Sequence, residues 1–286
     1  MPKSVVVIGA ATLDRILHVP TYPKPDTKAA CKTFESGGGN AANTASALGR
    51  LFLSSSRTHI TDPDHTHVKL LSKISTDEIG QALSAELEEY GVDLTSPLCI
   101  RAEGTSPVVT VIVTNVRPYT RTCLFDAGTV GTLIPSDLEL QGINITAVLD
   151  NTIHFHSDTR HTEVALALAN EAKIRGITIS VDCERDRFSA EFDELIDLAN
   201  IVFTNEDLME TILRRRLDCN HPFEGVVLDG DSSDRERFGF YVRVATLCHL
   251  LTKLQQWRNT TNENGVTTPK ELIVTRYVPV RGLFMQ

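Results

Sequence analysis

The chain has 286 residues, of which 41% are hydrophobic and 23% are charged, proportions ordinary for a soluble globular protein. Its net charge of −9, from 37 acidic and 28 basic residues, argues against a broad surface for nucleic acid or for an anionic membrane. No apolar stretch approaches the roughly 18 residues of a membrane helix, and a strand is expected from residue 5, so we expect a cytoplasmic protein without a signal peptide.

The first half of the chain begins with a short apolar run at residues 5–8, typical of a buried parallel strand. Residues 10–28 contain three prolines and are expected to form turns and sheet edges. A helix is expected from about residue 40 to residue 51, and a strand at 68–74. The clearest helix is predicted over 77–90, because leucine and isoleucine recur there every four residues and a glycine follows.

The second half opens with two β-branched, apolar runs at residues 107–114 and 121–126, which predict paired strands. Strand and helix patterns then alternate: strands at 153–156, 177–182 and 201–204, and helices at 163–175 and 192–199. Repeated strand–helix units predict an α/β fold with a parallel sheet and helices on both faces. Beyond residue 210 the pattern weakens to a candidate helix at 247–257 and a strand at 272–275.

The most informative motif is a run of three glycines that leads into a helix rich in small residues. Gly37, Gly38 and Gly39 have no Cβ, so the backbone can turn sharply and approach a ligand closely. Asn40 and Asn43 follow three residues apart and therefore share a helix face, where amides suit a hydroxyl-rich ligand. The run is neither a P-loop nor a G-x-G-x-x-G loop. A purely structural turn is the alternative.

This run, together with Asp14 upstream, resembles the first signature of the ribokinase/PfkB family of carbohydrate kinases. The Leu-Asp, Tyr-Pro-Lys, Gly-Gly-Asn-Ala and Arg-Thr runs are most similar to the ketohexokinase-like branch. The resemblance covers roughly residues 5–207. It implies a ribokinase-like fold in a single domain, residues 1–286, with a small β lid inserted at about 11–36 and 99–124. It also implies transfer of the γ-phosphate of ATP, with Mg²⁺, to a sugar hydroxyl, and a homodimer formed through the lid.

The resemblance also implies roles for individual residues. The sugar would be bound by Asp14, Asp26, Gly38, Gly39, Asn40 and Asn43. Arg121 would reach from the lid to the transferred phosphate, a role that suits its permanent charge and paired donors; a solvated edge-strand arginine is the alternative. Glu184 and Asn205 end successive strands, where oxygen ligands could serve Mg²⁺ and the nucleotide. Leu208 replaces the glutamate of the family's Asn-x-x-Glu, and capping of a helix is the alternative for Asn205.

The family's second signature, a Gly-Ala-Gly-Asp turn that carries the catalytic aspartate, occurs nowhere in the sequence. We therefore expect a chain that is truncated at its C-terminus and catalytically incomplete, with no catalytic residue to assign. A non-catalytic sugar-binding or interaction module is the first alternative. A Rossmann-type nucleotide binder is the second, and Asn40 and Asn43 argue against it because a dinucleotide loop has further glycines there.

Metal and disulfide chemistry find little support in the sequence. The six cysteines are widely spaced and form no CxxC pair, so reduced thiols are the simplest interpretation. His154 and His156 share a strand face, and His161 follows. Their spacing matches no common zinc motif, so we expect no bound metal there.

Overall fold

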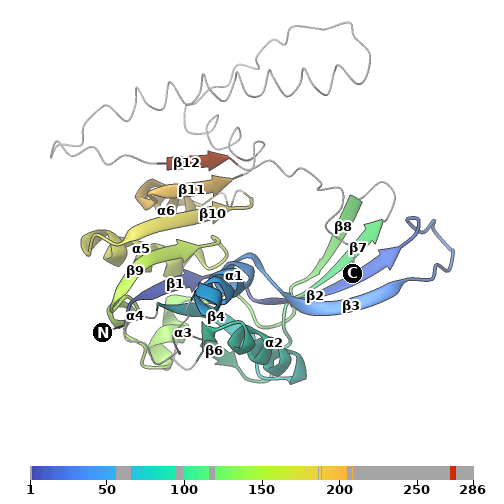
Figure 1. Ribbon diagram of the computed structural model, residues 1–286, viewed down its shortest axis with the longest axis horizontal. Helices are drawn as coiled ribbons and strands as arrows, with labels where there is room; N and C mark the ends of the chain where they lie inside the picture. The colour runs from blue at the N-terminus through green and yellow to red at the C-terminus, as the bar shows by residue number, and fades with distance from the viewer. Residues whose placement is uncertain are drawn as a thin grey trace, which may run out of the picture.

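The computed structural model describes residues 2–55, 66–94, 99–115, 120–185, 187, 189–204, 208 and 271–274. Within these residues, eight strands form one sheet in the order β12-β11-β10-β9-β1-β4-β5, with β6 paired to β4 (Figure 1). All of these pairs are parallel. The strands are β1 (Ser4–Ile8), β4 (His67–Ser75), β5 (Val92–Asp93), β6 (Cys99–Ala102), β9 (Thr152–Ser157), β10 (Thr178–Cys183), β11 (Ile201–Thr204) and β12 (Glu271–Val274).

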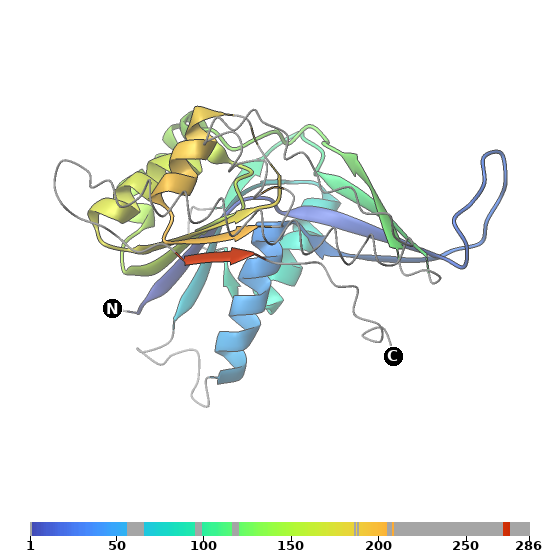
Figure 2. The same ribbon diagram turned by 90° about the horizontal axis from the view of Figure 1, so that it is seen from above.

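Helices cover both faces of this sheet, as Figure 2 shows with the blue helix on one side and the yellow and orange helices on the other. The first face carries α1 (Asn40–Ser55) and α2 (Glu78–Glu89). The opposite face carries α3 (Pro135–Leu140), α4 (Ile145–Val148), α5 (Thr162–Ile174) and α6 (Ala190–Leu198). The predicted α/β class, a parallel sheet between helical layers, is therefore confirmed.

Strand β1 lies at the centre and contributes to both hydrophobic cores. Val5 and Val7 pack in the cluster formed with α1 and α2, whereas Val6 and Ile8 pack in the cluster formed with α5 and α6. Successive side chains of a strand point to opposite faces of the sheet. A strand buried on both faces must therefore be apolar throughout, which is why an uninterrupted apolar run predicted it.

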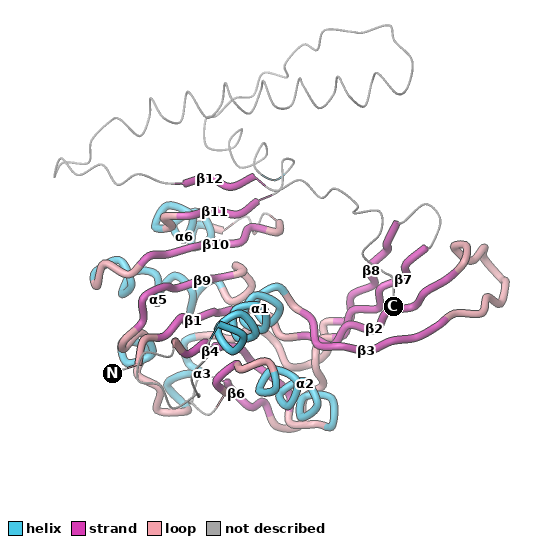
Figure 3. Tube along the Cα trace, viewed as in Figure 1, coloured by secondary structure: helices cyan, strands magenta, loops and turns pink. Residues whose placement is uncertain are grey.

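A second, four-stranded sheet projects from one end of the parallel sheet (Figure 3). Its order is β3-β2-β7-β8, with β2 parallel to β7 and the other two pairs antiparallel. The strands are β2 (Thr12–Val19), β3 (Lys32–Gly38), β7 (Val109–Asn115) and β8 (Thr120–Asp126). The chain leaves β1, builds β2 and β3, and returns to the parallel sheet through the glycine turn and α1.

Most predicted elements formed, including α2, β4, the β7–β8 hairpin and the alternating strands and helices between residues 152 and 204. The prediction of turn and edge material at residues 10–28 was wrong for β2, which is an inner strand. The first proline of this segment, Pro20, comes only after β2 ends, so nothing prevents β2 from pairing on both of its edges. Helix α1 runs four residues beyond its predicted end, to Ser55. The helix predicted at 247–257 lies outside the described residues.

No helix in the described part of the chain is both long and apolar enough to cross a membrane.

Candidate functional site

The two sheets meet where β1 ends, and a buried carboxylate joins the segments there. Asp158 follows β9, and its Oδ2 accepts hydrogen bonds from the backbone N–H groups of Ala10 (2.8 Å) and Ala41 (3.2 Å). Its Oδ1 accepts from the backbone N–H of Arg160 at 2.9 Å. One side chain therefore connects the end of β1, the first turn of α1 and the loop after β9.

The position of the Asp158 side chain also requires a glycine at position 9. A Cβ built on Gly9, which has φ +152°, would come within 2.0 Å of Asp158 Oδ1. Burial raises the pKa of Asp158, and the hydrogen bonds from Ala10, Arg160 and Ala41 oppose that rise. Asp158 was not among the predicted site residues; its position directly after a predicted parallel strand, where ligand sites gather, was the available signal.

Asp14 lies on β2, next to the glycine turn. Thr12 Oγ1 donates to Asp14 Oδ1 at 3.2 Å, and a Cβ on Gly38 would meet Asp14 Cγ at 2.2 Å. Burial raises the pKa of Asp14, whereas hydrogen bonds from Thr12 and Thr110 and the positive charge of Arg121 lower it. The half-buried carboxylate therefore lies beside the turn, surrounded by groups from β2, β3, β7 and β8.

The turn itself packs tightly on the end of β1. Gly39 has φ +92°, and a Cβ there would come within 2.4 Å of the carbonyl oxygen of Ala10. The same oxygen accepts a hydrogen bond from Ala42 N at 3.1 Å. Both the backbone conformation and the close approach therefore require glycine at position 39. Asn40 begins α1 directly after it and is half-buried.

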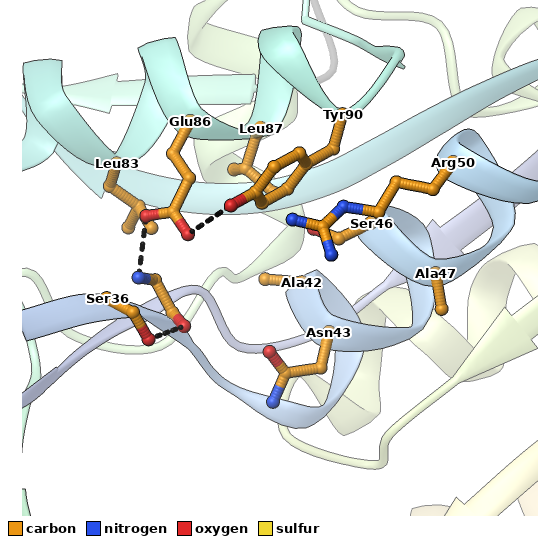
Figure 4. Close-up of a pocket in the computed structure, with 11 residues that line it drawn as sticks. Ser36, Ala42, Asn43, Ser46, Ala47, Arg50, Leu83, Glu86, Leu87 and Tyr90 are labelled. Carbon is orange, nitrogen blue, oxygen red and sulfur yellow. Dashed lines mark hydrogen bonds between the residues drawn. The ribbon is translucent and has the colours of Figure 1, made fainter. Parts of the chain in front are cut away.

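Asn43 lies one turn further along α1 and is exposed. It lines a cavity of about 310 Å³ between α1 and α2 (Figure 4). There Glu86 accepts from Gly37 N at 2.7 Å and from the Tyr90 hydroxyl at 3.2 Å, and the Arg50 guanidinium stacks over the Tyr90 ring at 3.5 Å. The hydrogen bond from Gly37 to Glu86 thus holds the glycine turn against α2.

The remaining predicted site residues are placed differently. Asp26 lies in the loop beyond the His18–Lys32 pair, at the opposite end of the β2–β3 hairpin from Gly38, so the structure does not bring it to Asp14. Arg121 is exposed on β8, and its charge acts on Asp14. Glu184 is exposed just after β10. Asn205 lies outside the described residues.

A second cavity, of about 550 Å³, opens on the α1 face of the sheet. Ser180 Oγ there lies 2.8 Å from both His154 Nε2 and His156 Nδ1. Burial lowers the pKa of both histidines, that of His156 to about 4. Asp182 lines the same cavity, and burial, with the charges of Asp158 and Glu184, raises its pKa to about 6. Among the described residues, no three His, Cys, Asp or Glu side chains are grouped to hold a metal ion.

The structure is an α/β protein in which polar side chains gather at the carboxyl ends of parallel strands, beside a small β sheet, the place where such folds bind ligands. Residues 2–221 match the family described as pfkB family carbohydrate kinase, and the chain belongs to that family.

Its relatives include an ATP-dependent ribose-1-phosphate kinase from Halopiger xanaduensis, 25% identical over 210 residues, which cover 73% of this chain and 64% of that protein. Among solved structures, a ribokinase from Giardia lamblia superposes with a TM-score of 0.58 at 16% identity, covering 73% of this chain and 64% of the other. An Arabidopsis thaliana ribokinase complexed with ribose and ATP gives 0.56 at 17% identity, covering 87% and 70%. The chain thus spans less than two thirds of the curated relative's length. These relatives are kinases of ribose or its phosphate, and the ketohexokinase-like branch stays a prediction.

Proposed function

We propose that this chain binds a sugar between the glycine turn and the inner face of the four-stranded sheet, as part of an ATP-dependent sugar kinase. The observation that carries the proposal is the Asp14 carboxylate against Gly38, beside Thr110 and within the field of Arg121. A half-buried carboxylate accepts hydroxyl hydrogens strongly. The family and its ribokinase relatives support the same ligand class.

In the proposed site, Asp14 accepts hydrogen bonds from sugar hydroxyls, while the turn at Gly38 and Gly39 lets the sugar approach the backbone. Asn40 and Asn43 add amide donors and acceptors at the start of α1. Asp26 lies at the far end of the β2–β3 hairpin, so the hairpin loop would have to move to bring Asp26 to the sugar. The four-stranded sheet would then act as a lid that excludes water.

The proposed reaction joins the sugar hydroxyl oxygen to the γ-phosphorus of ATP and breaks the bond from that phosphorus to the bridging oxygen of ADP. The hydroxyl proton goes to a base, which we do not assign within this chain. Arg121 would stabilise the transferred phosphoryl group. Mg²⁺ would arrive on the ATP phosphates, with Glu184 contacting it through water and Asn205 contacting the nucleotide.

Titration calorimetry with D-ribose and D-fructose, each with and without ATP and Mg²⁺, tests the proposal. Asp14→Asn should weaken sugar binding by about tenfold or more, because a charge-assisted hydrogen bond becomes a neutral one. Glu35→Gln is the matched control, since Glu35 is exposed on the neighbouring strand and pairs with Arg15 at 2.7 Å. Equal sugar affinity in both variants would refute the assignment.

A second candidate is a sugar-binding protein that does not transfer phosphate. Asp14, Gly38 and Gly39 offer contacts for a sugar, whereas no base for the hydroxyl proton is assigned among the described residues. Incubation of the sugar-loaded chain with ATP labelled at the γ-phosphate decides between the two. A labelled sugar product supports the kinase, whereas sugar binding without label transfer supports the second candidate.

We also propose that the outer face of the four-stranded sheet forms a homodimer. Leu13, Val109 and Leu124 lie on this face by strand register, and Leu124 is 56% exposed. Apolar side chains gathered on one exposed face favour association. Light scattering of wild type and of Leu124→Lys checks this: we expect a dimer for the first and a monomer for the second, and a monomeric wild type would contradict it.

A further inference from the structure

The cavity between α1 and α2, beside the glycine turn, arises from a step in side-chain size along α1. The two helices come close at Gly49, where a Cβ would lie 2.2 Å from the carbonyl oxygen of Tyr90. Nearer the turn, α1 lines the cavity with the small side chains of Ala42, Ser46 and Ala47. The space left between the helices, about 310 Å³, is at the lower end of the about 300–1,000 Å³ that is usual for small-molecule sites.

Two opposite charges face this cavity, and one tyrosine holds both in position. The Tyr90 hydroxyl donates to Glu86 Oε1 at 3.2 Å, and the Arg50 guanidinium lies 3.5 Å from the centroid of the Tyr90 ring. Figure 4 shows both charged side chains extending into the space between the helices. Neither Glu86 nor Arg50 forms an ion pair with the other, or with any residue in the described part of the chain.

Both charged groups retain hydrogen-bonding capacity. A carboxylate has about four acceptor positions, and Glu86 uses one for Gly37 N, at 2.7 Å, and one for the Tyr90 hydroxyl. A guanidinium has five N–H donors, and stacking on a ring uses none of them. Because Glu86 is half-buried, it would attract a bound cation more strongly than a fully solvated carboxylate does. A ligand with one cationic and one anionic end would therefore satisfy both groups.

The remaining walls of the cavity are largely apolar. Leu83 and Leu87 of α2 are buried, 3% and 2% exposed, and they line the cavity together with Ala42 and Ala47 of α1. An aliphatic group placed against these side chains would be removed from water, at a gain of about 0.8 kcal/mol for each buried methylene. The lining thus favours a small ligand that joins two opposite charges to an aliphatic group.

We propose that this cavity binds a free α-amino acid with an aliphatic side chain. The ammonium group of the ligand donates to Glu86, and its carboxylate accepts paired hydrogen bonds from Arg50. Because Glu86 also accepts from Gly37 N, the bound ligand fixes the carboxylate and thereby stabilises the glycine turn. Of the residues proposed to bind the sugar, only Asn43 lines this cavity as well, so the inference does not depend on the proposed function.

Titration calorimetry on the full chain tests the class of ligand. The probes are leucine and two analogues that each lack one charged end, isopentylamine and isocaproate. We expect leucine to bind with a Kd of about 1 mM or tighter, and each analogue about tenfold or more weakly than leucine, because each leaves one charged group of the cavity unpaired. The inference is overturned if leucine does not bind, or if either analogue binds as tightly as leucine.

Substitutions test the place of binding. Glu86→Gln and Arg50→Gln should each weaken leucine binding by about tenfold or more, and Arg50→Lys should retain part of the affinity. Glu89→Gln is the matched control, because Glu89 is exposed on the same helix and does not line the cavity. Ser46→Leu keeps both charged groups, fills the cavity and should abolish binding. Unchanged leucine affinity in these cavity variants would place the leucine elsewhere.

Thermal unfolding establishes that each variant folds. Should Glu86→Gln unfold because the turn has lost part of its anchor, Arg50→Gln and Ser46→Leu decide, since neither changes the contact between Glu86 and Gly37.

Hydrogen exchange of the Gly37 amide tests the effect on the turn. With leucine bound, this amide should exchange about threefold or more slowly, because its hydrogen bond to Glu86 is stabilised. An unchanged exchange rate in the leucine complex would refute the coupling. Leucine binding without any sugar binding would leave this inference standing and refute the proposed function, whereas sugar binding without leucine binding would do the reverse.

Discussion

The carboxylate of Asp14 lies so close to Gly38 that a Cβ on the glycine would come within 2.2 Å of Asp14 Cγ. Gly38→Ala should therefore push the carboxylate out of position while the flexible side chain absorbs most of the clash. We expect sugar affinity to fall about tenfold or more with a loss of stability near 1 kcal/mol. Calorimetry and urea unfolding measure the two effects. Glu35→Gln, on the opposite face of β3 and paired with Arg15, is the control; a Gly38→Ala variant with unchanged affinity would contradict the site.

Gly9 should tolerate no side chain. Its Cβ would lie 2.0 Å from Asp158 Oδ1, and its φ of +152° is one that other residues rarely adopt. Gly9→Ala should lower the free energy of unfolding by roughly 2–4 kcal/mol, because overpacking and backbone strain add. Urea denaturation measures this. Part of the loss should disappear in the Asp158→Ala background, and strictly additive losses would show that the two residues do not clash.

Asp158→Ala should itself destabilise the protein. It leaves the backbone N–H groups of Ala10, Ala41 and Arg160 without their acceptor, and each buried unpaired donor costs about 1–3 kcal/mol. Asp158→Asn keeps one oxygen and should lose less. Hydrogen exchange of the Ala10 and Ala41 amides checks the mechanism, because both should exchange faster in the alanine variant. Unchanged protection of these two amides would rule out the proposed role.

The stability of the protein should decrease as pH falls from about 6.5 to about 4. Burial, with the charges of neighbouring basic groups, lowers the pKa values of His156 and His161 to about 4, so the unfolded state takes up protons first. Each histidine contributes on the order of 3 kcal/mol to this loss. Asp182 acts in the opposite sense, because its raised pKa lets the folded state bind a proton below about pH 6.

Urea unfolding across this pH range measures the slope. His156→Asn keeps an acceptor near Ser180 but does not titrate, so its slope should be shallower than that of wild type. Asp182→Asn removes the opposing group and should make the slope steeper. Parallel pH profiles for the three proteins would mean that neither group titrates differently in the folded and unfolded states.

Much of the fold follows from short stretches of sequence. The apolar run predicted β1 because a strand that is buried on both faces is apolar throughout. The four-residue period predicted α2 because a helix that is buried on one face repeats its apolar residues at that spacing. The glycine turn was predictable for a similar reason, since the close approaches at Gly38 and Gly39 admit no Cβ. In β2 the prediction failed, because the prolines that follow the strand were taken to interrupt the whole of residues 10–28.

What the sequence by itself determined is local: which residues form strands and helices, and where the chain needs glycine for a sharp turn. Only the tertiary structure decided that Asp158 would join three segments, that Asp26 would lie far from Asp14, and that Arg50 and Glu86 would face one cavity. These relationships depend on which strands are neighbours and on their register. A parallel sheet pairs strands far apart in the chain, so no local pattern carries that information.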